Sequence, residues 1–445
     1  MDDFRLIADR LAADIASGRL RPGDRLPAQR RFARDHGIAG STAARVYGEL
    51  VRRGLVVGEV GRGTFVRAGR ARPEPALADP ANAPVDLELN FPVLPEQSAA
   101  LAESIAGLLR PDTLTAALLP TTPAGTAEVR AACAAALGRG GWQPDPERIL
   151  FAGNGRQAIA AALSAVAGVG ERVGVEALTY PVVKAVAGRL GITLVPIEMD
   201  ADGLLPGALR AVHAATPLRA VYLQPAVHNP LGVTMPAARR AELADALSEL
   251  DLLAVEDAVN AFLRADLPPL CSLAPDRVTL LDSLSKRLAP GLSLGFVLPP
   301  AALAGRVAAA LRSGGWVPQR FALEVAGRCA ADGTLAGIEA AKRRDARARQ
   351  ELRAEALAGF TVRADPASYH CWWELPDPWR AETFVAAAAR QGIAVSPAAA
   401  FTVGAGHAPN AVRLAMSGPP PERLRAALDT LAGLARTTAE DAGLE

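Results

Sequence analysis

Short runs of strand-forming residues alternate with alanine-rich helical stretches through most of this chain, and this alternation constrains the fold more than any other feature. From about residue 120 onward the runs are RILFAG, RVGVEA, TLVPIEM, AVYLQP, LLAVED, VTLLDS and LGFVLP. Strands separated by helices imply a mostly parallel sheet with helices on both faces. The chain has 445 residues and is 50% hydrophobic, so it can bury the core that such a sheet needs.

Polar residues follow several of these runs directly. Asn229 comes after VYLQP, Asp257 ends LLAVED, and Lys286 lies just beyond VTLLDS. The segment GNGRQ, residues 153–157, follows RILFA and opens a helix. Ligands of a parallel sheet bind beyond the C-terminal ends of its strands. We therefore expect these residues to line one site.

Lys286 is an unusual residue in a chain with 48 Lys plus Arg but only three lysines, Lys184, Lys286 and Lys342. A primary amine can form an imine with an aldehyde, whereas the guanidinium of arginine stays protonated and delocalised. This chemistry suits pyridoxal 5'-phosphate (PLP). The sequence therefore predicts Lys286 as the Schiff-base lysine and the catalytic residue.

The neighbouring polar residues match the other needs of PLP. The pyridine nitrogen needs a carboxylate to hold its proton, which is a role for Asp257. Asn229 is placed to donate to the ring 3-oxygen, and Tyr180 in EALTYP is placed to stack on the ring. The predicted phosphate ligands are backbone N–H groups at a helix start and two hydroxyls, from Asn154, Gly155, Arg156, Gln157, Ser283 and Ser285.

Residues 86–435 resemble a fold-type I PLP-dependent aminotransferase, because EALTYP, HNPLG and SLSKRLAPGL occur in the order of that family. The resemblance implies an α/β fold with a mostly parallel sheet and a smaller C-terminal α/β subdomain at about residues 320–445. It implies the same roles for Lys286, Asp257 and Asn229. It also implies that Arg413, in NAVRLAM, grips the α-carboxylate of an amino acid.

Two positions depart from the family pattern. Ser293 stands where the family usually has an arginine on the cofactor phosphate, and Asn260 stands where it usually has a tyrosine. Arg156 or Arg287 would have to supply the lost charge, or the cofactor is held more weakly. A body that has lost PLP and only dimerises is the alternative.

The first seventy residues differ in charge from the rest. They carry 14 Arg against 8 Asp and Glu, a net charge of +6, and the remainder carries a net charge of −5. The sequence predicts three helices in this region: one over residues 4–15 from its helical spacing, a short one over 27–35, and a third capped by Ser41 or Thr42. Two predicted strands follow, over 54–60 and 63–69. This order is typical of a winged helix-turn-helix.

The segment SGRLRPGDRLPAQRRFARDHGIAGSTAARVYGELVRRGLVVGEVGRGTFV resembles the DNA-binding domain of GntR-type bacterial regulators. The resemblance implies DNA contacts at Arg30, at Ser41 and Thr42 where the recognition helix begins, and at Gly63 in the wing.

Two contacts of that family are missing. Ala39-Gly40 replaces the usual Ser-Arg, and Ala44 occupies a position that is often basic. Arg45 and Arg62 are the candidates to compensate, since phosphate contacts can come from many arginines. A wing kept only for packing or dimerisation is the alternative.

Together the two resemblances identify the chain as a member of the MocR subgroup of GntR regulators. The predicted domains are a winged helix-turn-helix at 1–68, a linker at 69–84 with four prolines in its last fourteen residues, and an aminotransferase-like body at 85–445. The resemblance implies a homodimer of bodies.

The remaining features exclude other classes. The four cysteines lie far apart, which argues against disulfides or a metal site, and no run is long enough to span a membrane. We expect a cytoplasmic bacterial protein without a metal. His370 is attributed to packing, and AKRRDARARQELRAE, residues 341–355, is predicted to be a solvated helix face.

Two functions fit these observations. The first is a transcriptional regulator whose head binds operator DNA and whose body senses PLP or an amino compound. The alternative is an active PLP-dependent aminotransferase with a vestigial head. The loss of the usual arginine and tyrosine, at Ser293 and Asn260, argues against efficient turnover.

Overall fold

The computed structural model describes residues 4–16, 19–20, 24–52, 55–59, 63–66, 83–404 and 408–437. The chain divides into two compact units, Met1–Ala76 and Leu77–Glu445, called here the head and the body. The division falls inside the predicted linker at 69–84. Residues 67–82 lie outside the described part of the chain, so the exact domain boundaries stay a prediction.

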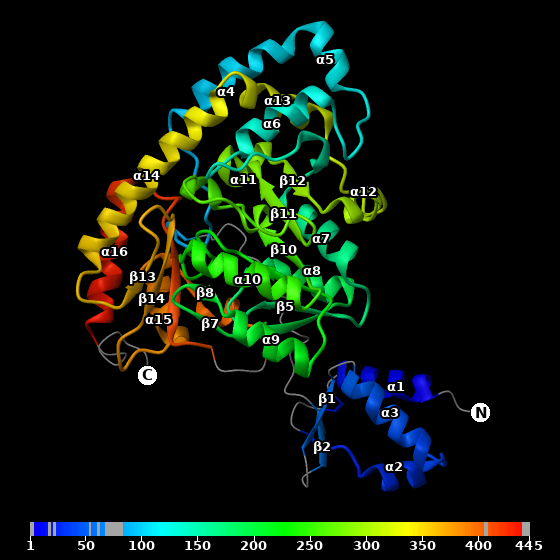
Figure 1. Cartoon of the computed structure of the whole chain (residues 1–445). Helices are drawn as coiled ribbons and strands as arrows, with labels where there is room; N and C mark the ends of the chain where they lie inside the picture. Colours follow the sequence, from blue (N-terminus) through cyan, green and yellow to red (C-terminus); the bar gives the residue numbers. More distant parts are fainter. Residues whose placement is uncertain are drawn as a thin grey trace. The chain divides into compact units, whose positions relative to one another are not determined.

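The head is a three-helix unit with a hairpin, as the sequence predicts (Figure 1). Its elements are α1 (Phe4–Ala16), α2 (Gln29–Asp35), α3 (Gly40–Arg52), β1 (Val56–Glu59) and β2 (Gly63–Val66). Phe32, Val46 and Leu50 are buried between the helices because they repeat at helical spacing on the inner sides of α2 and α3. One detail is corrected: α3 begins at Gly40, so Ser41 and Thr42 lie in its first turn and do not cap it.

All seven predicted strands form one sheet in the body. The strands are β4 (Leu150–Ala152), β5 (Arg172–Glu176), β6 (Thr193–Ile197), β9 (Ala220–Leu223), β10 (Leu253–Asp257), β11 (Val278–Ser283) and β12 (Gly295–Leu298), in the spatial order β4-β12-β11-β10-β9-β5-β6. Only β12 runs antiparallel to its neighbours within this sheet. The other six strands therefore present their C-terminal ends at one edge, where a ligand site is expected.

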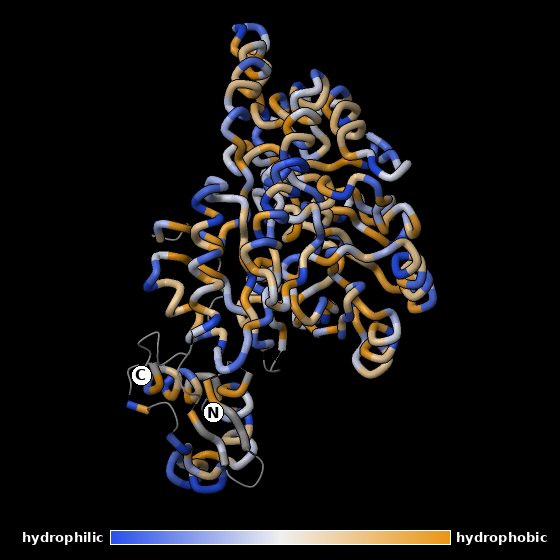
Figure 2. Tube along the Cα trace, turned by 90° about the vertical axis from the view of Figure 1, so that its left-hand side faces the viewer, coloured by the Kyte–Doolittle hydropathy of each residue, from blue (hydrophilic) through white to orange (hydrophobic). Residues whose placement is uncertain are grey.

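Helices cover both faces of this sheet (Figure 1). One hydrophobic core lies between the sheet and α7 (Gly155–Val166), α8 (Pro181–Leu190) and α12 (Ala304–Ser313). The other lies between the sheet and α6 (Ala127–Leu137), α9 (Pro206–Ala215), α10 (Ala237–Glu249) and α13 (Arg320–Ala331). Figure 2 shows hydrophobic residues recurring between hydrophilic ones along the helices, as expected where one side of each helix is buried.

A smaller domain completes the body. Its sheet has the order β13-β14-β17-β16, from β13 (Val362–Arg363), β14 (His370–Glu374), β16 (Ser396–Pro397) and β17 (Ala411–Ala415). The remaining helices of the body are α4 (Gln97–Ala106), α5 (Pro111–Ala117), α11 (Leu284–Arg287), α14 (Thr334–Ala356), α15 (Ala381–Arg390) and α16 (Pro421–Ala435). Two antiparallel strands, β7 (Met199–Asp200) and β8 (Gly203–Leu204), form a separate pair.

The small domain also contains a strand that the sequence did not predict. Strand β3 (Val85–Asp86) precedes the large sheet in the chain, yet it pairs in parallel with β15 (Ile393–Ala394) near the C-terminus. The small domain is therefore built from both ends of the body. None of the described helices is long and apolar enough to cross a membrane.

Candidate ligand site and DNA-binding face

Asp257 ends β10 and is held by its neighbours at the edge of the sheet. The hydroxyl of Tyr222 donates to its Oδ2 over 2.6 Å, and Gln224 Nε2 donates to the same oxygen over 3.2 Å. The backbone N–H of Val259 donates to Oδ1 over 3.1 Å. Burial raises the pKa of Asp257, and these hydrogen bonds oppose that rise. The carboxylate is fixed in direction, and sequence reasoning missed both side chains that fix it.

Lys286 lies on the single turn of α11, directly after β11. Its Nζ donates to the carbonyl oxygen of Asn90 and lies 3.8 Å from the ring centroid of Phe91. Burial lowers the pKa of Lys286 to about 7, and the positive charges of Arg413 and Arg156 lower it further. An amine with a pKa of about 7 exists partly as the neutral nucleophile and partly as the ammonium near pH 7.

Lys342 on α14 supports the turn that carries Lys286. Its Nζ is buried and donates to the carbonyl oxygens of Lys286 and Leu288 over 2.8 and 2.6 Å. Gln97 Nε2 donates to the same oxygen of Leu288 over 2.8 Å. The prediction that residues 341–355 form a solvated helix face is therefore wrong for this side of α14, where Arg349 is also buried.

Arg287 is not available to a phosphate group. Its guanidinium donates to Asp282 over 2.8 Å and to Glu339 over 2.6 Å, and its side chain is 3% exposed. The predicted cofactor contact of Arg287 is corrected for this reason. Arg156 and Arg287 were the two candidates to replace the charge of the arginine that the family usually has at position 293. Because Arg287 is engaged elsewhere, Arg156 is the remaining candidate.

The starts of α7 and α11 meet at the predicted phosphate site, here called the cradle. Asn154 caps α7 by accepting from the N–H of Gln157 over 3.0 Å, so that N–H is already bonded. A side chain at Gly155 would approach the Cβ of Ser283 to 3.1 Å, so only glycine fits without a shift. Ser283 Oγ lies 3.3 Å from Ser293 Oγ.

Ser285 belongs to the same cradle. Its backbone N–H donates to Ser283 Oγ over 3.2 Å. Ser293, at the position of the family's arginine, thus adds a neutral hydroxyl where a charge is usual.

Arg413 on β17 reaches the site from the small domain. It donates to Asn229 Oδ1 over 3.2 Å, to Ser396 Oγ over 3.0 Å and to the carbonyl oxygen of Glu88. Its Nε is buried without a hydrogen-bond partner among the described residues. Burial lowers the pKa of Arg413 to about 10, so it stays charged at neutral pH. An orphaned donor on a charged group suits a carboxylate ligand.

Tyr180 and Arg156 complete the group of predicted residues. Tyr180 is the residue before α8; burial raises its pKa, and the charges of Arg156, Asp257 and Arg413 all act on it. Arg156 is exposed in the first turn of α7. Asn260 turns to the backbone and donates to the carbonyl oxygen of Val227 over 3.2 Å.

Two buried histidines stabilise the loop that carries Asn229. His228 lies 3.1 Å from Glu176, and His370 Nε2 lies 2.9 Å from the carbonyl oxygen of His228. Burial lowers the pKa of His370 to about 3, so it is neutral. Its contacts are those of a packed histidine.

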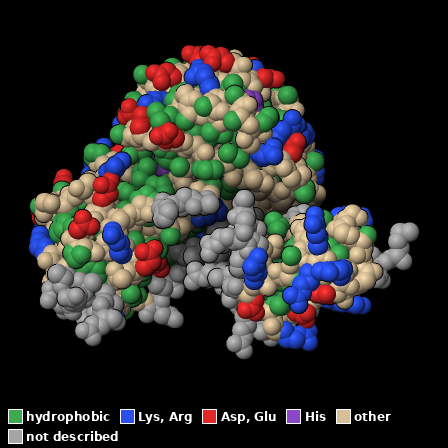
Figure 3. All heavy atoms as spheres, turned by 90° about the horizontal axis from the view of Figure 1, so that it is seen from below, with side chains coloured by type: hydrophobic (Ala, Val, Ile, Leu, Met, Phe, Trp, Pro, Cys, Tyr) green, Lys and Arg blue, Asp and Glu red, His purple; other side chains and the backbone are tan. Residues whose placement is uncertain are grey.

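Most of the predicted DNA contacts that the structure describes are exposed. Arg30 on α2 and Ser41 and Arg45 on α3 are exposed, and Thr42 is partly buried. The guanidinium of Arg45 lies 5.2 Å from the ring centroid of Phe4. Arginine side chains are prominent on the surface of the head in Figure 3, because this part of the chain contains no lysine. Arg62 lies outside the described residues, and Gly63 begins β2.

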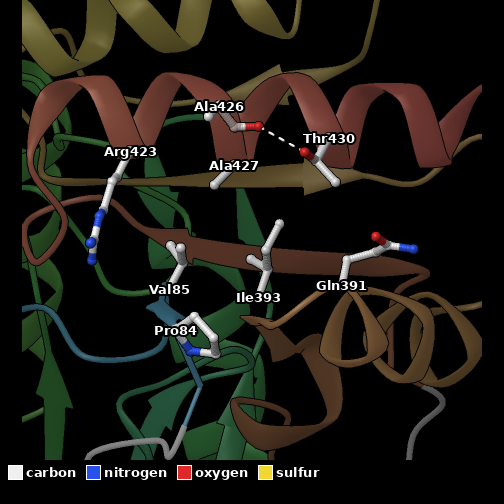
Figure 4. Close-up of a pocket in the computed structure, with 8 residues that line it drawn as sticks. All are labelled: Pro84, Val85, Gln391, Ile393, Arg423, Ala426, Ala427 and Thr430. Carbon is white, nitrogen blue, oxygen red and sulfur yellow. Dashed lines mark hydrogen bonds between the residues drawn. The ribbon is translucent and has the colours of Figure 1, made fainter.

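A hollow of about 310 Å³ lies away from these residues, beside β3, β15 and α16 (Figure 4). It is lined by Pro84, Val85, Gln391, Ile393, Arg423, Ala426, Ala427 and Thr430. None of the predicted ligand residues lines it, but Val85 of β3 does.

The fold and the site define a class of protein: a helix-turn-helix head joined to a body with the aminotransferase fold. Residues 91–431 match the family of class I and II aminotransferases, and residues 5–66 match the gntR family of bacterial regulatory proteins. The chain belongs to the class I and II aminotransferase family and carries a gntR domain, the combination that defines the MocR subgroup.

Individual relatives share this organisation to different extents. The HTH-type transcriptional regulator YdeF of Bacillus subtilis is 29% identical over 419 residues, which cover 94% of this chain and 90% of YdeF. The HTH-type pyridoxine biosynthesis transcriptional regulator PdxR of Corynebacterium glutamicum is 28% identical, over 67% of this chain and 66% of PdxR. An archaeal alanine:glyoxylate aminotransferase shares the fold with a TM-score of 0.73 at 23% identity, over 80% of this chain and 91% of that structure.

Proposed function

We propose that this chain is a PLP-responsive transcriptional regulator, whose head binds operator DNA and whose body binds PLP and an amino compound. One observation carries the proposal: a gntR head with exposed arginines is joined to a body in which the charges of Asp257 and Arg413 both act on Lys286. The names of YdeF and PdxR as transcriptional regulators support the first half. PdxR is named for pyridoxine biosynthesis, which supports the second.

The residues of the site fit PLP. Lys286 offers a primary amine with a pKa of about 7, and Asp257 offers a buried carboxylate held by Tyr222 and Gln224. Gly155 allows the start of α7 to approach Ser283 closely, which brings the N-terminus of the helix and the Ser283 hydroxyl to one place, as a phosphate site requires. When bound, PLP supplies an aldehyde that takes a primary amine and a ring that withdraws electrons.

Each residue has a defined task in this proposal. Lys286 binds the aldehyde, Asp257 holds a proton on the pyridine nitrogen, and Asn229 orients the ring oxygen. Arg156 supplies the positive charge that Ser293 lacks, and Tyr180 covers the ring. The cradle at Asn154, Gly155, Ser283 and Ser285 holds the phosphate group.

The effector is a compound with an amino group and a carboxylate. Arg413 binds the carboxylate, because its orphaned Nε needs an acceptor. A sensor does not need to turn over its ligand. Ser293 and Asn260, which replace the usual arginine and tyrosine, are therefore compatible with a sensing function.

We also propose that the protein is a homodimer of bodies in the bacterial cytoplasm. Leu109, Leu118 and Leu119 are 61%, 75% and 57% exposed on and beside α5, and an apolar group of this size favours burial against a second copy. Light scattering tests the dimer, and Leu118→Asp should weaken it.

Absorbance and gel shifts test the main proposal. Wild type with added PLP should develop a visible absorption band, Lys286→Ala should lose it, and Lys184→Arg should keep it. PLP should change the affinity of wild type for DNA from upstream of its own gene. Identical spectra for wild type and Lys286→Ala, or equal DNA affinity with and without PLP, would reject the proposal.

An active aminotransferase is the second candidate, because Lys286, Asp257, Asn229 and Arg413 are all present. Ser293 and Asn260 disfavour it. Rapid transamination of a common amino acid by the purified protein would favour this reading over sensing.

A further inference from the structure

The first described residues after the linker run through the ligand site. The segment Glu88–Phe91, called here the latch, follows β3 after one residue, Leu87. The carbonyl oxygen of Glu88 accepts from Arg413, and the carbonyl oxygen of Asn90 accepts from Nζ of Lys286. The latch thus accepts hydrogen bonds from the Lys286 amine and the Arg413 guanidinium, the two groups that the proposed ligands would bind.

Two side chains of the latch strengthen these contacts. The ring of Phe91 lies 3.8 Å from Nζ of Lys286, which is a cation–π contact. Asn90 Nδ2 lies 3.3 Å from His370 Nδ1, and Asn90 Oδ1 is buried without a partner among the described residues. The latch therefore contacts the site through both its backbone and its side chains.

The strand that carries the latch is short, but the residue between them is firmly anchored. Strand β3 has two residues and a single partner strand, β15. Val85 N–H donates to Gly392 O over 3.0 Å, and Leu87 donates to Ala394 O over 2.9 Å and accepts from Ala415 N–H over 2.7 Å. Leu87 is fully buried in the core of the small domain, whereas Figure 4 shows Val85 and Ile393 at the hollow below α16. The segment is therefore packed more loosely at Val85, next to the linker, than at Leu87.

We infer that the latch is an intramolecular ligand of the site, and that PLP and amino-acid effectors act on the head by displacing it. The inference rests on the proposed function. When the ammonium of Lys286 and an aldehyde join, two of its protons leave with the aldehyde oxygen as water, and the nitrogen becomes bonded to the aldehyde carbon. The ammonium that contacts Asn90 and Phe91 then no longer exists. A carboxylate at Arg413 likewise competes with the carbonyl oxygen of Glu88.

Displacement of the latch reaches the head through the covalent chain. Only β3 and Leu87 separate the latch from the predicted linker at 69–84, so movement of the latch that carries β3 with it changes the point from which the linker leaves the body. A ligand shifts such an equilibrium by its difference in affinity for the two arrangements. PLP and the latch compete for the same amine, which supplies that difference.

Phe91→Leu tests the competition, because it removes the cation–π contact and keeps an apolar side chain. A weaker latch competes less, so the Kd for PLP, measured by absorbance titration, should fall about three- to tenfold. The PLP concentration at half-maximal change in DNA affinity should fall by the same factor. Asn90→Ala, which removes the bond to His370, should move the Kd in the same direction. Val93→Ala is the control, because Val93 is 52% exposed and lies outside the latch.

Hydrogen exchange provides a readout that does not require bound PLP. Lys286→Ala should speed exchange of the peptide 85–94 to the level that wild type reaches with PLP. If wild type binds PLP but Phe91→Leu binds it equally or more weakly, the latch is rejected while the proposed function stands. Unchanged exchange in Lys286→Ala would reject the latch as well. A wild type without a visible band would instead reject the PLP site itself.

Discussion

The head and the body place their functional side chains in opposite surroundings. Arg30 and Ser41 are exposed on the helices of the head, whereas Asp257 and Arg413 are buried in the body and each polar contact has a fixed direction. Contacts to DNA phosphates are long-ranged and tolerate exchange of one arginine for another. A buried charge must be paired or its pKa shifts. A single substitution in the body should therefore have a large effect on stability or ligand affinity, whereas a single substitution in the head should have a small effect on DNA affinity.

The largest effect is expected for Arg287→Ala. Removing Arg287 leaves buried Asp282 with only the more distant Arg139, at 4.0 Å, and Glu339 with only Arg343, at 3.6 Å, so the free energy of unfolding should fall by about 3–5 kcal/mol. Urea denaturation measures it. Arg344→Ala, at an exposed arginine of α14, is the control and should stay within about 0.5 kcal/mol of wild type. Equal losses for both variants would break the contrast between buried and exposed charge.

Asp257→Asn should affect ligand binding next most strongly. Asparagine keeps the shape and accepts the bond from Tyr222, but it has no charge to hold a proton on the pyridine nitrogen. The affinity for PLP should fall roughly 10- to 100-fold, the value of a hydrogen bond to a charged group. Asp202→Asn, at an exposed carboxylate, is the control. If Asp257→Asn bound PLP as tightly as wild type, the Asp257 carboxylate would have no role in binding PLP.

The pH dependence of PLP incorporation gives a smaller but more specific test. Burial lowers the pKa of Lys286 from 10.5 to about 7, so the rate should rise with pH with its midpoint at about pH 7 and level off above that. An ordinary lysine would continue to accelerate toward pH 10.5. Arg156→Ala should move the midpoint to higher pH, because the charge of Arg156 contributes to the lowered pKa. Stopped-flow absorbance measures the rate, and a profile rising steadily through pH 9 would contradict this environment for Lys286.

The smallest effect is expected in the head. Arg30→Ala should weaken DNA binding at every sequence alike and reduce the slope of log affinity against log salt by about one. The PLP spectrum should not change, because Arg30 belongs to the other unit. Gel shifts at several salt concentrations measure the slope. A complete loss of binding would show that the head depends on single contacts, as the body does.

The architecture could be predicted because its signals are local. Each of the seven strands is marked by its own apolar run, and the polar residues at strand ends mark the edge where ligands bind. The winged helix-turn-helix could be predicted equally well, and only the start of α3 needed correction.

Arg287 was misplaced because sequence neighbours on a helix diverge. Consecutive residues point about 100° apart, so Arg287 faces Asp282 while Lys286 faces Asn90. An arginine beside an important lysine in sequence is therefore a poor candidate for the same ligand.

Lys342, Tyr222 and the latch were missed because their partners are distant in sequence. Lys342 did carry a signal: it is one of three lysines, and the buried residues Lys342, Ala346 and Arg349 follow helical spacing. The sequence carried no comparable signal for Tyr222 or for Glu88–Phe91. Their roles depend on which strands become neighbours, and composition and periodicity do not encode that.

The pairing of β3 with β15 also orders events during synthesis. Val85 leaves the ribosome early, but its partner Ile393 is made only when the chain is nearly complete. Domains generally fold as units from the N-terminus during translation. The nascent chain should therefore carry a folded head for most of its synthesis time, before the small domain exists. A newly made chain could contact DNA near its own gene before it can respond to any small molecule.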